Sequence, residues 1–161
     1  SSIDFFNWYS NKIGLSWSYE NWIEAWADIC TRNSYGTDLF KRVRDSEHQL
    51  CILSNLAEYH KLAVQSKFPD FWNEADTNFL SFEIGRLKPD PEIYLTVCRK
   101  VGLRPDNCFY FDDTKEYIPI ALGLGLKAHV FADSKTNDLL DWINKQGLTL
   151  SSNKAMERNF E

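Results

Sequence analysis

Several features that would assign the chain to a broad class are missing from its sequence. No apolar run approaches the ~20 residues that a transmembrane helix needs, and no secretory signal pattern opens the chain. Basic residues are outnumbered, with 18 Lys and Arg against 23 Asp and Glu, which gives a formal charge of −5. An acidic protein lacks the basic face that nucleic acid or an anionic membrane requires. We therefore predict neither nucleic acid nor membrane as a partner.

Cysteine occurs, but in no pattern typical of a metal site or a redox pair. Cys30, Cys51, Cys98 and Cys108 are widely spaced, and none forms a C-x-x-C pair. Three of them lie in apolar segments, which is typical of buried free thiols. We therefore expect a cytoplasmic protein.

At 161 residues the chain has the size of one domain, and its 43% hydrophobic content can form a real core. Its first 33 residues are rich in tryptophan and have apolar residues at helical spacing. We predict two helices here, the first ended by Gly14 and the second capped by Ser18. Their aromatic faces either pack in a core, which we favour, or line a substrate pocket. A turn is expected at residues 33–36.

From Thr37 onwards, short apolar segments alternate with helical patterns. Such alternation predicts parallel strands joined by right-handed helical crossovers. The expected class is α/β, a Rossmann-like parallel sheet with helices on both faces. The strands are expected at residues 50–53, 79–82, 109–111 and 127–131, and a polar, aperiodic tail covers 149–161.

The most informative segment is the third strand, because it ends in two adjacent acids, Asp112 and Asp113. Unpaired charges are costly to bury, so a buried strand does not usually end in this way unless the acids have a use. Ligands of open α/β sheets bind at the carboxyl ends of the strands. One explanation is that an acid only caps the next helix; we favour a metal or phosphate site.

Two other polar groups lie where strands or loops end: the pair Ser54-Asn55 after the first strand, and Lys88 in a later loop. Since all the carboxyl ends of a parallel sheet lie on one edge, these groups can converge with the acids. A hydroxyl, a cation and carboxylates are what a phosphoryl group with Mg²⁺ requires.

At this point the sequence resembles the haloacid dehalogenase-like (HAD) hydrolase superfamily, most of whose members are magnesium-dependent phosphatases. The second family motif is matched by Leu-Ser-Asn at 53–55, the third by Arg-Leu-Lys-Pro-Asp-Pro-Glu-Ile-Tyr at 86–94, and the fourth by Tyr-Phe-Asp-Asp at 110–113. The residues of these three motifs are most similar to those of the branch that contains sugar-phosphate phosphatases and the phosphatase domain of soluble epoxide hydrolases. The resemblance implies that 1–35 is the C-terminal part of a small helical cap and 36–148 the α/β core.

The resemblance also implies a role for each matching residue. Ser54 and Asn55 would bind a phosphoryl oxygen, and Lys88 would neutralise the phosphate and the attacking carboxylate. Asp113 would hold Mg²⁺, while Asp112 would orient neighbouring groups. Taken singly, Ser54 and Asp113 could be helix caps and Lys88 a solvated surface residue. Their joint occurrence in the motif order favours the site.

Other polar residues carry less weight. His60 could reach the site from the helix after Ser54, but a structural role is at least as plausible. His48 and His129 show no partner pattern. Many relatives have Asp or Asn four residues after the metal-binding acid, and here that position is Tyr117.

The first family motif, an apolar strand ending in Asp-x-Asp that supplies the nucleophile, has no match in residues 1–36. In the family this strand is the centre of the sheet, between the strands that end at Leu53 and Phe111. Without it, two strands would leave unpaired backbone groups facing a gap. The single methionine is Met156, and either removal of a leading Met or a truncated chain would explain that. We expect a fragment; the alternative is a degenerate relative that folds differently.

The function expected of the full protein is hydrolysis of a small phosphorylated metabolite, with Mg²⁺, through an aspartyl-phosphate intermediate. This chain alone would be inactive. Two alternatives stay open: a metal-independent 2-haloacid dehalogenase, which the paired acids disfavour, and a non-catalytic relative that binds a phosphorylated ligand or a protein. The sequence does not indicate the oligomeric state or the substrate.

Overall fold

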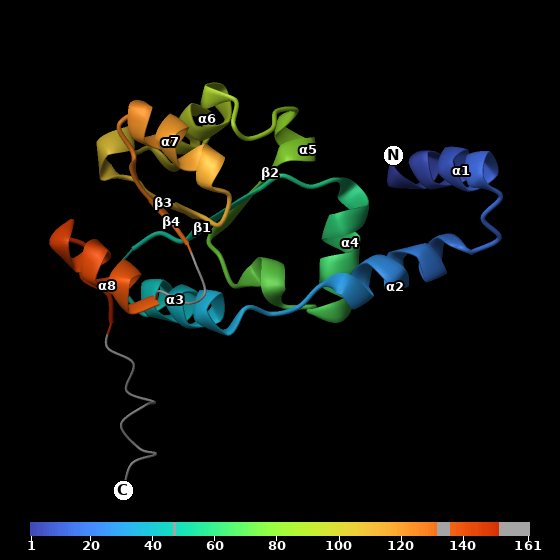
Figure 1. Ribbon diagram of the computed structural model, residues 1–161, viewed down its shortest axis with the longest axis horizontal. Helices are drawn as coiled ribbons and strands as arrows, with labels where there is room; N and C mark the ends of the chain where they lie inside the picture. The colour runs from blue at the N-terminus through green and yellow to red at the C-terminus, as the bar shows by residue number, and fades with distance from the viewer. Residues whose placement is uncertain (47, 132–135, 152–161) are drawn as a thin grey trace, which may run out of the picture.

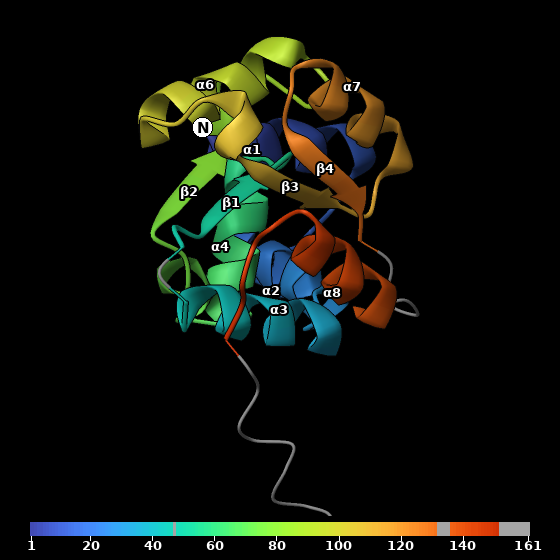
Figure 2. The same cartoon turned by 90° about the vertical axis from the view of Figure 1, so that its left-hand side faces the viewer.

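The computed structural model describes residues 1–46, 48–131 and 136–151 and contains parallel strands with helices on both sides (Figures 1 and 2). The α-helices are α1 (Ser2–Ile13), α2 (Tyr19–Ile29), α3 (Ser34–Arg44), α4 (Glu58–Lys67), α5 (Ser81–Ile84), α6 (Pro91–Val101), α7 (Ile118–Gly123) and α8 (Thr136–Lys145). The strands are β1 (Cys51–Ser54), β2 (Thr77–Leu80), β3 (Phe109–Asp112) and β4 (Lys127–Val130). Three short 3₁₀ turns, Phe71–Asn73, Pro105–Asn107 and Lys115–Tyr117, complete the described elements. The predicted α/β class is confirmed.

The strands form two separate parallel sheets, β1–β2 and β3–β4. Cys51 pairs with Thr77 in the first sheet, and Phe109 pairs with Lys127 in the second. Among the described residues, no ladder of backbone hydrogen bonds joins β1 to β3. This is the arrangement expected when a central strand is missing from between them. In Figure 2, α6 and α7 lie above the strands and α3 and α8 below them.

Local sequence explains why the helices begin and end where they do. Asp90 caps α6 by accepting a hydrogen bond from the backbone N–H of Glu92, and Pro91 occupies the first turn, where no N–H is needed. Gly102 ends α6 in the left-handed conformation, at φ 72°, which favours glycine. The predicted caps of the first two helices, Gly14 and Ser18, are confirmed in the same way.

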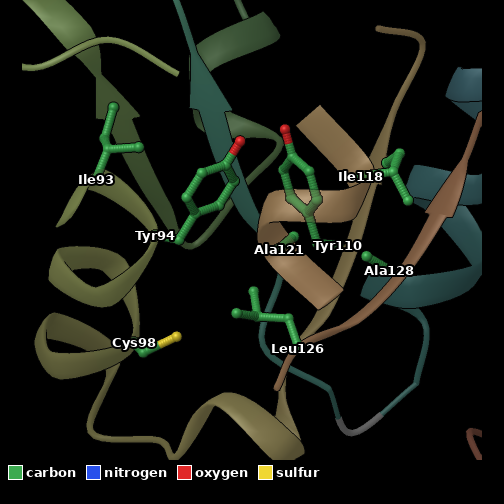
Figure 3. Close-up of a cluster of buried hydrophobic side chains, with 8 residues drawn as sticks. All are labelled: Ile93, Tyr94, Cys98, Tyr110, Ile118, Ala121, Leu126 and Ala128. Atoms are coloured by element: carbon green, nitrogen blue, oxygen red, sulfur yellow. The ribbon is translucent and has the colours of Figure 1, made fainter. Parts of the chain in front are cut away.

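Two apolar clusters cover the two faces of the β3–β4 sheet. The first lies between β3, β4, α6 and α7, and its buried residues are shown in Figure 3. They are Ile93, Tyr94, Cys98, Tyr110, Ile118, Ala121, Leu126 and Ala128. The second cluster joins Leu39 of α3 to Leu139 and Ile143 of α8, with Phe111 of β3 against it. The strand that carries the paired acids is therefore packed on both faces.

Some element boundaries differ from the sequence-based expectation. The strand predicted at 79–82 is β2, which ends at Leu80, and Ser81 already begins the short helix α5. The turn predicted at 33–36 is the start of α3, because the Asn33 side chain accepts a hydrogen bond from the backbone N–H of Gly36 and caps the helix. The predicted tail at 149–161 lies mostly outside the described residues.

Helices α1 and α2 extend to one side of the strands, as Figure 1 shows, and α2 packs against α4. Phe6, Trp22, Ile23, Ala27 and Ala63 form their buried core, so the packing role expected for the aromatic faces is confirmed for α2 and for Phe6 of α1. The other large apolar residues of α1, Ile3, Phe5, Trp8, Tyr9 and Ile13, are exposed. Within the described part of the chain, no helix is long and apolar enough to cross a membrane.

Candidate active site

A buried ion pair between Lys88 and Asp112 lies at the carboxyl ends of β1 and β3. Lys88 Nζ donates to Asp112 Oδ2 at 2.6 Å and to the carbonyl oxygen of Leu53 at 3.0 Å. Both side chains of the pair are under 10% exposed. One ammonium group thus binds residues at the ends of two strands that belong to different sheets. The alternative that Lys88 is a solvated surface residue is wrong.

Asp112 is fixed by a complete set of donors. Its Oδ2 also accepts a hydrogen bond from the Tyr110 hydroxyl at 2.5 Å, and its Oδ1 accepts from the backbone N–H of Thr114 at 2.9 Å. Burial alone would raise the pKa of this carboxyl, but the hydrogen bonds from Lys88 and Tyr110 and the charge of Lys88 outweigh it and lower the pKa. Burial and the neighbouring carboxylate raise the pKa of Tyr110. The Asp112 carboxyl is therefore ionised at neutral pH, with Tyr110 as a neutral donor.

Asn55 holds the backbone of Lys88 rather than facing open space. Its side chain accepts from the backbone N–H of Lys88 at 2.8 Å and donates to the Lys88 carbonyl at 2.9 Å. Its amide also lies 3.4 Å from the Tyr117 hydroxyl. This two-way bond fixes the loop that carries the cation to the end of β1. With both ends of its side chain engaged, Asn55 acts on Lys88 in this structure, and the predicted phosphate contact by Asn55 stays a prediction.

Ser54 and Asp113 differ from these residues because their side chains have no hydrogen bond or ion pair within the described part of the chain. Ser54 is half-buried at the end of β1, and Asp113 is exposed just beyond β3. A hydroxyl and a carboxylate are thus left available beside a fixed cation.

The lysine also retains donor capacity. An ammonium group has three N–H donors, and the bonds to Leu53 and Asp112 use two of them. The rings of Tyr110 and Tyr117 lie 5.9 and 5.2 Å from the nitrogen and shield it from water. The remaining donor, with the Ser54 hydroxyl, is suited to the oxygens of a phosphoryl group.

The fit to Mg²⁺ is partial. This ion prefers octahedral oxygen ligands and is usually bound by one or two carboxylates together with substrate phosphate and water. Asp113 offers one such carboxylate, whereas the oxygens of Asp112 are engaged by other donors. No cluster of three or more His, Cys, Asp or Glu suited to a metal occurs among the described residues. Asp113 would hold the ion together with ligands supplied from outside this set.

The three histidines lie outside this constellation. His60 Nδ1 accepts a hydrogen bond from the backbone N–H of Ala57, and its ring packs against Trp26 and Tyr59. Its role is therefore to stabilise the first turn of helix α4. Burial lowers its pKa. The ring of His48 bonds the Thr149 carbonyl, and that of His129 lies against the Val130 carbonyl.

Sequence reasoning missed two residues of the site. Tyr110 precedes Asp112 by two positions on β3, so the two side chains share one face of the strand, and that spacing could have predicted their bond. Ser81 accepts from the backbone N–H of Leu56 and donates to its carbonyl, which joins the end of β2 to the loop after β1. No sequence signal indicated Ser81, because it stood within a presumed strand.

Comparison with known proteins finds that this fold is similar to that of HAD family enzymes. No family model matches the chain. A curated relative, flavin mononucleotide hydrolase 1 of Arabidopsis thaliana, is 38% identical over 65 residues, which cover 39% of this chain and 26% of the relative. The chain thus spans about a quarter of that relative's length.

Two solved structures show the same fold. One is a HAD family enzyme of Bacteroides thetaiotaomicron in complex with magnesium and inorganic phosphate, with a TM-score of 0.73 and 22% identity over 83% of this chain and 70% of that chain. The other is a HAD phosphatase of Thermococcus onnurineus, with a TM-score of 0.62 and 20% identity over 76% of this chain and 56% of that chain. The resemblance to HAD-like hydrolases is therefore confirmed, and their Rossmann-type fold with it.

Proposed function

We propose, on the premise of this HAD-like fold, that the chain forms most of the active site of a magnesium-dependent phosphatase acting on a small phosphorylated metabolite. The observation that carries the proposal is the fixed Lys88–Asp112 pair with Ser54 and Asp113 beside it, all at the carboxyl ends of parallel strands. Ligands of open α/β sheets bind at this edge, outside the carboxyl ends of the strands. Magnesium and phosphate occur together in a solved structure of the same fold.

Each residue has a separable role in this proposal. The Ser54 hydroxyl donates to a phosphoryl oxygen, and the remaining Lys88 donor offsets charge on the phosphate and on the attacking carboxylate. Asp112 keeps Lys88 in place, and Asn55 keeps its loop in place. Asp113 would contribute to a Mg²⁺ site, where the bound ion neutralises phosphate charge. The nucleophile is an aspartate outside this chain; its carboxylate bonds to phosphorus as the alcohol leaves, and water then hydrolyses the aspartyl phosphate.

One phosphorylated metabolite can be selected as the first substrate to test. The curated relative is named for hydrolysis of flavin mononucleotide, a phosphate ester that carries a planar ring. In this chain, Phe5 stacks on Tyr59 with ring centroids 5.9 Å apart, and Phe5 remains 43% exposed. Tyr59 lies five residues after Ser54. An exposed aromatic face of this kind suits a planar aromatic group, so flavin mononucleotide is the first substrate to test.

The direct test is phosphate release from p-nitrophenyl phosphate and flavin mononucleotide with Mg²⁺. It uses this chain and the same chain extended by the sequence that precedes Ser1 in its gene. We expect activity in the extended chain only, its loss on chelation of Mg²⁺, and a fall of about 10²-fold or more for Asp113→Asn. Asp106→Asn is the matched control, because Asp106 is also exposed but pairs with Arg104 away from the site. Activity in the short chain would contradict the proposed origin of the nucleophile.

Tyr117 supports one other function, binding of a phosphorylated ligand without catalysis. Its ring lies over Lys88 and its hydroxyl lies near Asn55, at the position where many HAD enzymes have Asp or Asn. If the extended chain binds inorganic phosphate in equilibrium dialysis but hydrolyses neither ester, this second function replaces the first.

A further inference from the structure

Two of the four cysteines contact each other in the structure. Cys98 is on helix α6, and Cys108 lies directly before strand β3. The Cys98 thiol donates to Cys108 Sγ, and the two sulfur atoms are 3.6 Å apart. The Cys108 thiol donates in turn to the carbonyl oxygen of Arg104, at 3.4 Å. The two sulfur atoms are therefore in direct contact, and both carry free thiols.

The backbone at both cysteines is fixed, which keeps the thiols together. The carbonyl of Cys98 accepts a hydrogen bond from the backbone N–H of Leu103 at 3.0 Å. The N–H of Cys108 donates to the carbonyl of Pro105, and the Cys108 carbonyl accepts from the N–H of Lys127 on β4. Approach of the sulfur atoms to the about 2.0 Å of a disulfide thus starts from two residues that are already positioned.

A metal site is the other use of adjacent thiols, and the surroundings disfavour it. Structural zinc takes four protein ligands. Among the residues that the structure describes, no group of three or more His, Cys, Asp or Glu could hold a metal ion. Cys98 belongs to the apolar cluster of Figure 3, and Cys108 packs against that cluster. Two thiols alone in apolar surroundings favour a bond between the two sulfur atoms.

The two thiols differ in access. Cys98 is 3% exposed, whereas Cys108 is half-buried and lines a cavity of about 660 Å³ between β1 and β3. An oxidant therefore reaches Cys108 first. Burial, together with the adjoining Cys98 thiol, raises the pKa of Cys108 to about 12. Because the thiolate is the reactive form, oxidation is slow at neutral pH and requires the oxidant in excess.

We propose that Cys98 and Cys108 form a reversible disulfide on exposure to a hydroperoxide. The Cys108 sulfur attacks the O–O bond and becomes a sulfenic acid, which releases water from hydrogen peroxide or an alcohol from an organic hydroperoxide. The Cys98 sulfur then attacks the Cys108 sulfur. The S–O bond breaks as the S–S bond forms, and hydroxide leaves with the Cys98 proton as water. A dithiol restores both thiols by exchange and is itself oxidised to a disulfide.

The bridge would link the two elements that hold the buried ion pair. Lys88 precedes α6 and Asp112 ends β3, so the ion pair joins these elements at one end and the bridge joins them at the other. Oxidation should therefore leave the ion pair in place and make α6 and β3 harder to separate. The inference goes beyond the proposed function, because the bond forms without phosphate or Mg²⁺.

Peptide mapping of the intact chain tests the bridge directly. The chain is oxidised with hydrogen peroxide, the remaining thiols are blocked with iodoacetamide, and the protein is digested with trypsin without reductant. Trypsin cuts after Arg99 and Lys100, so the two cysteines fall in separate peptides, 87–99 and 101–115. We expect a mass spectrum in which these two peptides are joined, and their separation after treatment with dithiothreitol.

Other products of the same digest would overturn the inference. One is a bridge between Cys51 and Cys108, which line the same cavity. Others are a bridge between two copies of the chain, and Cys108 oxidised to a sulfinic acid while Cys98 is alkylated. Oxidation of Cys30, at the end of α2, with Cys98 and Cys108 both alkylated would overturn it too.

A variant separates the bridge from general oxidation. Cys108→Ala should abolish the joined peptides, whereas Cys51→Ala should keep them. Cys51 is the matched control because it is also half-buried and lines the same cavity. In urea, the oxidised chain should populate its unfolded state at least about tenfold less than the reduced chain, and Cys108→Ala should show no such gain. If circular dichroism shows that Cys108→Ala is unfolded, Cys108→Ser replaces it; an equal gain in the variant would overturn the inference.

The chain extended by the sequence that precedes Ser1 should form the same bridge. Formation in the short chain alone would show that the bridge depends on an open cavity, and would overturn the inference. An extended chain that forms the bridge but hydrolyses neither ester would overturn the proposed function alone. An extended chain that hydrolyses an ester but forms no bridge would overturn this inference alone.

Discussion

Strands β1 and β3 are linked at their carboxyl ends and separated further back. At the carboxyl ends, the side chain of Lys88 bonds both strands within 3.0 Å. Further back, the strands share a cavity and no backbone ladder among the described residues. A side-chain ion pair thus joins the two halves at the point where the site is built. The site geometry therefore depends on this pair more than on the sheet.

The two halves joined in this way are not equally packed. On the β3–β4 side, clusters around Tyr110 and around Leu139 cover both faces of the sheet. All four residues of β1, by contrast, are only half-buried. Removing the Lys88–Asp112 ion pair should therefore destabilise the β1–β2 half more than the β3–β4 half.

The largest effect is expected from Lys88→Met. It leaves Asp112 buried without its cation, which typically costs about 3–5 kcal/mol of folding free energy. Urea unfolding measures the loss, and adding Asp112→Asn to Lys88→Met should recover part of it, since no buried charge then remains. Arg104→Met removes an exposed ion pair and should change the unfolding free energy by less than about 1 kcal/mol. Equal effects of the two methionine variants would show that the buried pair does not join the halves.

A smaller effect is expected from acid, because protonation removes the charge of Asp112 but leaves its oxygens in place. The pKa of Asp112 is lowered in the folded chain, against about 3.9 in an unfolded one. Its contribution is therefore present above about pH 4 and is lost as the pH falls through the folded-state pKa. Unfolding free energies measured between about pH 2 and 6 should fall on acidification, and less steeply in Asp112→Asn. The same slope in both proteins would assign the acid sensitivity to other carboxyls.

The smallest effects concern two tyrosines whose rings pack edge to face, 5.2 Å apart (Figure 3). Tyr110→Phe removes a hydrogen bond to a buried carboxylate and should lower the unfolding free energy by about 1–2 kcal/mol. The Tyr94 hydroxyl is buried with no hydrogen-bond partner among the described residues, so Tyr94→Phe should be neutral or stabilising. Thermal unfolding of the two variants makes a matched comparison. A larger loss from Tyr94→Phe would mean that its hydroxyl has a partner, such as an ordered water.

Much of the fold could be predicted because its signals are local. Asp90-Pro91 and Gly102 mark the ends of α6 by capping chemistry that needs no tertiary partner. The convergence of Lys88 with Asp112 followed from the rule that parallel strands end at one edge. The resemblance predicted a gap between the strands that end at Leu53 and Phe111, and the division into two separate sheets falls at that place.

Other features could not be predicted from the sequence because they depend on packing. The segment around Ser81 is short and apolar, and a run of that length does not distinguish a strand from a buried helical turn. Sequence order likewise could not show which of two adjacent acids would meet Lys88. The structure assigns the buried position to Asp112, which shares a strand face with Tyr110, and leaves Asp113 exposed.

The separation of Lys88 from Asp112 has a consequence for synthesis on the ribosome. Lys88 precedes its acid partner by 24 residues, so the growing chain presents the cation before any carboxylate can neutralise it. Domains generally fold as units during synthesis, and β1, β2 and α6 all leave the ribosome earlier than β3. The anion-binding group is therefore in its working position only after β3 has been made, and a nascent chain that stops short of Asp112 carries an unfinished site.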